Sequence, residues 1–75
     1  MRNNLGFLLL EMEDAAAARG VFAEGLAART GVELEQSLYG LALALARLQR
    51  PAEAAAARAR LAAAFPHSAY LGKLP

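Results

Sequence analysis

The sequence predicts an all-α domain made of two stacked helix-turn-helix hairpins, and three observations lead to this prediction. Leucines recur with the 3.6-residue period of a helix, most clearly in residues 34–48. No stretch shows the alternation of a strand, as expected for an all-helical chain. The chain also nearly repeats itself after 36 residues: Leu5-Gly6-x-x-Leu9 returns as Leu41-Ala42-x-x-Leu45, and Ala16-x-Ala18 returns as Ala52-x-Ala54. A period in this range is typical of stacked helical hairpins.

The first hairpin is expected at about residues 3–29. One of the two asparagines at positions 3 and 4 is a good N-cap for a first helix that runs to Met12. Asp14 is the expected cap of a second helix, which continues through four alanines to Arg29. The two helices would therefore be joined by a very short link.

Glycines and a capping signal mark the end of this hairpin. Gly20 and Gly25 each cost about 1 kcal/mol inside a helix, so they indicate close approach of a neighbouring helix. Thr30 and Glu33 have the spacing of a capping box, in which each side chain accepts a hydrogen bond from a backbone N–H at a helix start. The third helix is therefore expected to begin at about Glu33.

The second hairpin is expected at about residues 33–65. Its first helix carries the periodic leucines and ends at about Leu48. Pro51 stands where proline is best tolerated, in the first turn of a helix, and Pro66 cannot continue that helix. The tail, residues 66–75, is expected to start a short fifth helix with Ser68 as its cap.

The residue pattern resembles the tetratricopeptide repeat, a helix-turn-helix unit of about 34 residues. The resemblance covers about residues 2–66 as two tandem repeats and is closest to bacterial members. The matching residues are Leu5-Gly6, Leu9, Ala18 and Phe22 in the first unit and Leu38, Leu41-Ala42, Leu45, Ala54, Leu61 and Pro66 in the second. Arg58 departs from the pattern, because the family usually has Phe there.

The resemblance implies a binding groove on the first helix of each unit. The groove positions are Asn3, Phe7, Leu10 and Glu11 in the first unit and Gln36, Tyr39, Leu43, Ala46 and Arg47 in the second. Family members that bind a C-terminal carboxylate do so with Lys, Asn and Arg on these faces, whereas Phe7 and Tyr39 occupy two of the key places here. We therefore expect the groove to accept an apolar peptide or helix, with Arg47 adding a charged contact.

The resemblance implies a non-catalytic protein-interaction module or scaffold, and a chaperone subunit for secretion or assembly is the alternative. Two repeats are fewer than the three usually needed for stability. Self-association is therefore expected about as readily as binding of a foreign protein. A four-helix bundle is the competing fold, because the same leucines could face one centre.

Other function classes have little support in the sequence. His67 is the single His, and its neighbour Ser68 has no third group to orient a base, so no enzyme and no cofactor are expected. The acidic residues Glu11, Glu13 and Asp14 lack the spacing of a calcium loop, so no metal site is expected.

A net charge of +1 gives no reason to expect nucleic acid as a partner. The arginines at positions 47, 50, 58 and 60 are better explained as a solvated rim. No apolar run is long enough for a membrane span, and the run at 5–10 is short for a secretory leader. The absence of Cys is compatible with cytoplasm and periplasm alike, and the cytoplasm is slightly preferred.

Overall fold

Helices make up all regular secondary structure in residues 2–27 and 31–74, the part of the chain that this computed structural model describes; of residues 2–4 it describes the backbone. The predicted all-α class is confirmed. The bounds are α1 Arg2–Glu11, α2 Ala15–Gly25, α3 Gly31–Arg47, α4 Pro51–Ala64 and a 3-10 helix η1 Ala69–Lys73.

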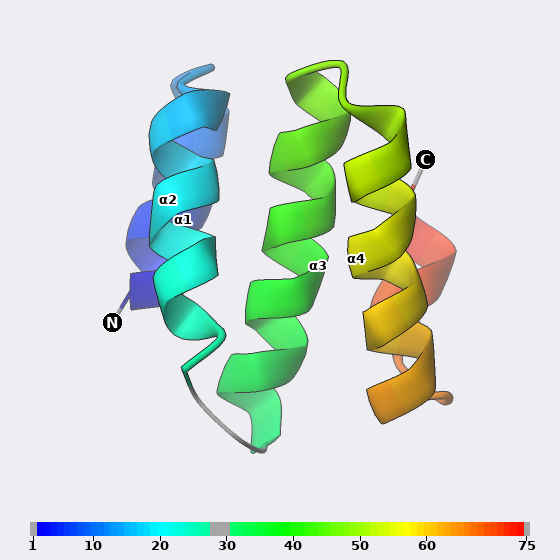
Figure 1. Cartoon of the computed structure of the whole chain (residues 1–75). Coiled ribbons are helices and arrows are strands. Elements are labelled where there is room, and N and C mark those ends of the chain that lie inside the picture. The colour runs from blue at the N-terminus through cyan, green and yellow to red at the C-terminus, as the bar shows by residue number, and fades with distance from the viewer. Residues whose placement is uncertain (1, 28–30, 75) are drawn as a thin grey trace.

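The order of the helices in space follows their order in the sequence. Helices α1 and α3 run in one direction, and α2 and α4 run in the opposite direction (Figure 1). Helix α3 is central and contacts α1, α2 and α4, while η1 turns back and lies against α4. We call α1 and α2 the first helix pair, and α3 and α4 the second helix pair.

The turns inside the two helix pairs have the same backbone conformation. Glu13 and Gln49, which are 36 residues apart, both adopt positive φ, at +62° and +59°. In each turn this residue donates its N–H to the carbonyl three residues earlier, and the next residue donates to the carbonyl five residues earlier, at 2.8–3.1 Å. These bonds satisfy carbonyls at the end of a helix. The near-repeat of the sequence is thus also a repeat of backbone geometry.

Three predicted helix starts are confirmed. The Asp14 carboxylate accepts a hydrogen bond from the Ala17 N–H at 3.2 Å and caps α2. Pro51 is the first residue of α4. The Ser68 hydroxyl oxygen accepts from the Tyr70 N–H at 3.2 Å and caps the short fifth helix, which is of the 3-10 type.

Helix α2 ends earlier than predicted, at Gly25 and not at Arg29. Beyond Gly25, the N–H groups of Leu26 and Ala27 donate to carbonyls three residues back, at 3.2 and 3.1 Å. Such bonds tighten the last turn of a helix and end the α-helical hydrogen-bond pattern. Residues 28–30 lie outside the described residues.

Two other helices begin earlier than predicted. Helix α1 begins at Arg2, so the asparagines at positions 3 and 4 lie within it and do not precede it as a cap. Helix α3 begins at Gly31, two residues before Glu33, and Gly31 has φ +81°. Glycine adopts this conformation without steric cost, which allows the chain to turn into the helix there. The other half of the predicted capping box, Thr30, lies outside the described residues.

Phe22 of α2 lies at the centre of the joint between the two helix pairs and is 0% exposed. A Cβ added at Gly6 would lie 2.6 Å from its ring, and one added at Gly40 would lie closer still. These two glycines therefore make room for the ring. The predicted close approach at Gly20 is wrong, because nothing lies within 4 Å of a Cβ added there.

The apolar core of the described residues contains Leu38 and Leu61, which are 2% and 0% exposed, together with two clusters of packed side chains. The first joins the helix pairs and contains Leu10, Ala18, Phe22 and Ala44. The second lies within the second helix pair and contains Ala42, Leu45 and Ala57, with Leu74 of the tail packed against it. Four of the seven buried residues in the two clusters are alanines, whose small side chains let helices approach closely.

Candidate functional site

The face predicted to bind a partner is partly covered by the chain itself. Its aromatic residues form a series in which Phe7 packs edge-on against Phe22 and Tyr39 lies next to Phe7, with ring centroids 4.9 and 5.9 Å apart. Tyr70 of η1 then stacks on Tyr39 at 4.5 Å, and the Gln36 amide donates to the Tyr70 hydroxyl at 3.5 Å. The tail thus occupies the middle of the predicted face.

Two further predicted residues have internal roles. Leu10 is 4% exposed and belongs to the first core cluster, so its side chain is not part of an open surface. Arg47 donates from Nη1 to the Leu10 carbonyl oxygen at 2.7 Å. The same carbonyl oxygen also accepts from the Glu13 N–H at 3.0 Å, so the Arg47 bond is the second one that it accepts. Arg47 therefore links α3 to the end of α1.

The remaining predicted positions lie in different surroundings. Glu11 is exposed, and Leu43 is half-buried against the first core cluster. The side chain of Asn3 lies outside the described residues. Ala46 lines a separate hollow between α3 and α4. The nine predicted residues are therefore not one continuous open face.

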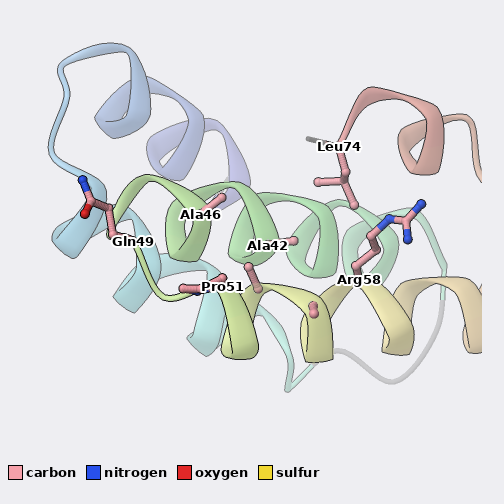
Figure 2. Close-up of a pocket in the computed structure, with 8 residues that line it drawn as sticks. Ala42, Ala46, Gln49, Pro51, Arg58 and Leu74 are labelled. Carbon is pink, nitrogen blue, oxygen red and sulfur yellow. The ribbon is translucent and has the colours of Figure 1, made fainter.

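An apolar groove of about 510 Å³ runs between α3 and α4, and we call it the α3–α4 groove. Its lining residues are Ala42, Ala46, Gln49, Pro51, Ala54, Ala55, Arg58 and Leu74. Figure 2 shows Gln49 and Pro51 at one end and Arg58 and Leu74 at the other. Because the residues between are alanines, the hollow is mainly apolar.

The groove corresponds by repeat position to a surface that is already filled elsewhere in the molecule. Three of its residues, Ala46, Ala54 and Arg58, stand 36 positions after Leu10, Ala18 and Phe22. Those three residues of the first helix pair are buried against Ala44 of α3. At these positions the first helix pair thus packs against α3, whereas the second helix pair has an open groove.

A second apolar surface lies on the outer side of α1, and we call it the α1 face. It consists of Leu5, Leu8 and Met12, which are 49%, 51% and 66% exposed. Their spacing of three and four residues places them on one side of a helix. Three large apolar side chains exposed in one row indicate an interaction surface.

Sequence reasoning found one residue of the groove, Ala46, and missed the others. The signal was present in the 36-residue repeat, since shifting the core residues of the first helix pair by one period gives Ala46, Ala54 and Arg58. The substitution of Arg for the expected Phe at position 58 also indicated that this surface faces water.

Few groups in the described residues are arranged for chemistry. His67 is exposed in the link between α4 and η1, and the hydroxyl of its neighbour Ser68 caps η1. Among the described residues, no three His, Cys, Asp or Glu side chains lie close enough to hold a metal ion. Within that same part of the chain, every helix is too short or too polar to cross a membrane.

Comparison with models of protein families, with curated proteins and with solved structures found no match for this chain.

Proposed function

We propose that this chain is a non-catalytic protein-interaction module of the tetratricopeptide type, in which two stacked hairpins present a groove for an apolar helix of a protein partner. The groove in question is the α3–α4 groove. The face predicted from the sequence, on the first helix of each unit, is called the helix-A face here. It is the second candidate, because the tail covers Tyr39 there.

The observation that carries the proposal is the equivalence between the groove and the surface that holds α3. The backbone turn of the second helix pair repeats that of the first, so equivalent positions have equivalent geometry. Leu10, Ala18 and Phe22 already pack against a helix. A surface of the same shape, with alanines at two of these positions, is suited to receive another apolar helix.

The composition of the lining also allows the groove to be exposed to water when no partner is bound. Alanines present little apolar area, and the long Arg58 side chain lays an aliphatic stem along the groove while its charged head stays in solvent. The Gln49 amide at the other end offers a donor and an acceptor to a polar group at the end of a bound helix.

Chemical-shift mapping by NMR tests the proposal. The probe is a synthetic amphipathic helical peptide with leucines spaced three and four residues apart, titrated into the full chain. We expect saturable shifts at Ala46, Ala54 and Ala55. The variant Ala55→Glu should lose this binding, whereas Ala59→Glu, an exposed position on α4 outside the groove, should keep it.

A second pair of substitutions separates the two candidate surfaces. Binding through the α3–α4 groove should survive Tyr39→Ala together with Leu43→Ala, provided that circular dichroism shows unchanged helicity. Shifts confined to Phe7, Tyr39 and Leu43, or loss of binding in this double variant alone, would instead assign binding to the helix-A face and contradict the proposal.

A further inference from the structure

The α1 face and the α3–α4 groove correspond to the two halves of an interface that already exists inside the molecule. Leu5, Leu8 and Met12 stand 36 positions before Leu41 and Ala44 of α3 and Leu48, the residue that follows α3. Ala44 is fully buried against the first helix pair, and Leu41 packs against both core clusters. The exposed face of α1 is thus equivalent, by repeat position, to the face of α3 that packs against the first helix pair.

The receiving half is equally well defined. The first helix pair holds α3 with Leu10, Ala18 and Phe22, and the second helix pair has Ala46, Ala54 and Arg58 at these positions, in the groove. One copy of the chain therefore has the open α3–α4 groove on its second helix pair and the exposed α1 face on its first.

We propose that copies of this chain associate head to tail, with the α1 face of one copy entering the α3–α4 groove of the next. This inference rests on the proposed function and names a second copy as the protein partner. Continuity with the internal interface supports it, because the same contact between helix pairs is made once within the chain and again between chains.

The lengths of the segments support the same occupant. Residues 69–73, which form η1, are the repeat equivalents of 33–37 in α3, and residues 2–11, which form α1, are the equivalents of 38–47. The tail of one copy and α1 of the next would together span nearly the whole length of α3. Leu74 already packs against the second core cluster at the end of the groove, where the two segments would meet.

The charges of the two turns are also complementary. The turn of the first helix pair carries Glu11, Glu13 and Asp14. The turn of the second carries Arg47, which donates to the Leu10 carbonyl, and Arg50, which pairs with Glu53 at 3.6 Å on the exposed surface. Both turns lie at the same end of the molecule (Figure 1). In a head-to-tail array, the acidic turn of one copy would lie beside the basic turn of the preceding copy. Unlike charges there favour the association and its polarity.

A contact between two different surfaces leaves one free surface of each kind on the resulting pair, unlike the contact of a two-fold symmetric dimer. Repetition of such a contact yields open chains of copies, unless the rotation happens to close a ring. The proposal therefore predicts assembly that grows with concentration, with no plateau at the mass of a dimer.

Sedimentation velocity over a concentration series tests this with the full chain. Leu8→Glu on the α1 face and Ala54→Glu in the groove should each raise the concentration needed for assembly by about tenfold or more, because each buries a charge in the contact. Val32→Glu and Ala59→Glu, which place the same charge on exposed positions outside both surfaces, should change it by about twofold at most. Circular dichroism checks that each variant remains helical, and Ala55→Glu replaces Ala54→Glu if that variant unfolds.

Mixing the two defective variants gives the most specific outcome. The Leu8→Glu chain keeps an intact groove, and the Ala54→Glu chain keeps an intact α1 face. An equimolar mixture should therefore form a one-to-one dimer that grows no further, although neither variant assembles alone. No other pairing of surfaces predicts this complementation.

Three results would overturn the inference: a wild-type chain that stays monomeric throughout the series, a wild-type plateau at the dimer, or a mixture of variants that forms no dimer. None of them decides the proposed function, because the leucine peptide of the NMR titration tests the groove without self-association. Peptide binding without assembly would leave a foreign helix as the partner, and failure of both experiments would remove the groove as a binding site.

Discussion

The two helix pairs share a backbone design but use it differently. Both have the same turn, with a left-handed residue at Glu13 or Gln49. In the first pair, Phe22 is buried under α3 together with Leu10 and Ala18; in the second, Arg58 occupies the position of Phe22 beside an open groove. On the same backbone, therefore, a few side chains on the inner face of a helix pair differ between a buried core and an open groove.

Among the substitutions that test this difference, removal of the Phe22 ring should change the free energy of unfolding most. Phe22→Ala should lower the free energy of unfolding by about 3–5 kcal/mol, since a fully buried aromatic side chain leaves a cavity. Arg58→Ala, at the equivalent exposed position, should change it by about 0.5 kcal/mol or less. Urea denaturation followed by circular dichroism measures both. Equal effects at the two positions would show that the helix pairs are not organised as described.

Filling the space around the ring should have the next largest effect. Gly40→Ala places a Cβ against the Phe22 ring and should cost about 1–3 kcal/mol of unfolding free energy through overpacking. The matched control is Gly20→Ala, where the added methyl group meets open space and the helix gains about 0.5–1 kcal/mol. The same denaturation curves decide this. A stabilising Gly40→Ala would mean that Phe22 is free to move aside.

The link between α3 and the end of α1 should have a smaller effect. Arg47→Gln removes the donor to the Leu10 carbonyl oxygen and should cost about 0.5–1.5 kcal/mol. Glu11 is the repeat equivalent of Arg47 and is exposed, so Glu11→Gln serves as the control and should stay within about 0.5 kcal/mol. Thermal unfolding monitored at several ionic strengths measures both variants. An Arg47→Gln chain as stable as the wild type would argue against the hydrogen bond.

The smallest expected effects concern the two turns, and they should be equal. Glu13→Gly and Gln49→Gly relieve the cost of a positive φ and should each raise the free energy of unfolding by about 0.5–1 kcal/mol. Because the hydrogen bonds of the turns are the same, a clear gain in one turn and none in the other would break the equivalence of the two helix pairs. Chemical denaturation of the two variants side by side provides the measurement.

Local signals in the sequence predicted the helices well. A capping Asp or Ser and a first-turn Pro act through their nearest backbone neighbours, so Asp14, Ser68 and Pro51 were identified from sequence alone. The early end of α2 was missed because Gly25 was interpreted as a site of close packing within a longer helix. Gly25 is buried, but it is the last residue of that helix.

The candidate site was harder to predict, because it depends on contacts between residues far apart in the chain. No local signal indicates that Tyr70 stacks on Tyr39 or that Arg47 bonds to the Leu10 carbonyl. The predicted face therefore included residues that the chain uses for itself. The groove could be predicted by shifting the core residues of the first helix pair by 36 positions. That step also requires knowing that Phe22 is buried between the two helix pairs.

The stacking of Tyr39 on Tyr70 gives the molecule an intrinsic optical reporter. The chain has two Tyr residues and no Trp, so its near-ultraviolet signal above that of Phe comes from this pair. The two rings are nearly parallel and belong to α3 and to the tail, so any lifting of the tail separates the chromophores. Occupation of the neighbouring groove by a helix that displaces Leu74 would therefore change tyrosine fluorescence and circular dichroism without any label.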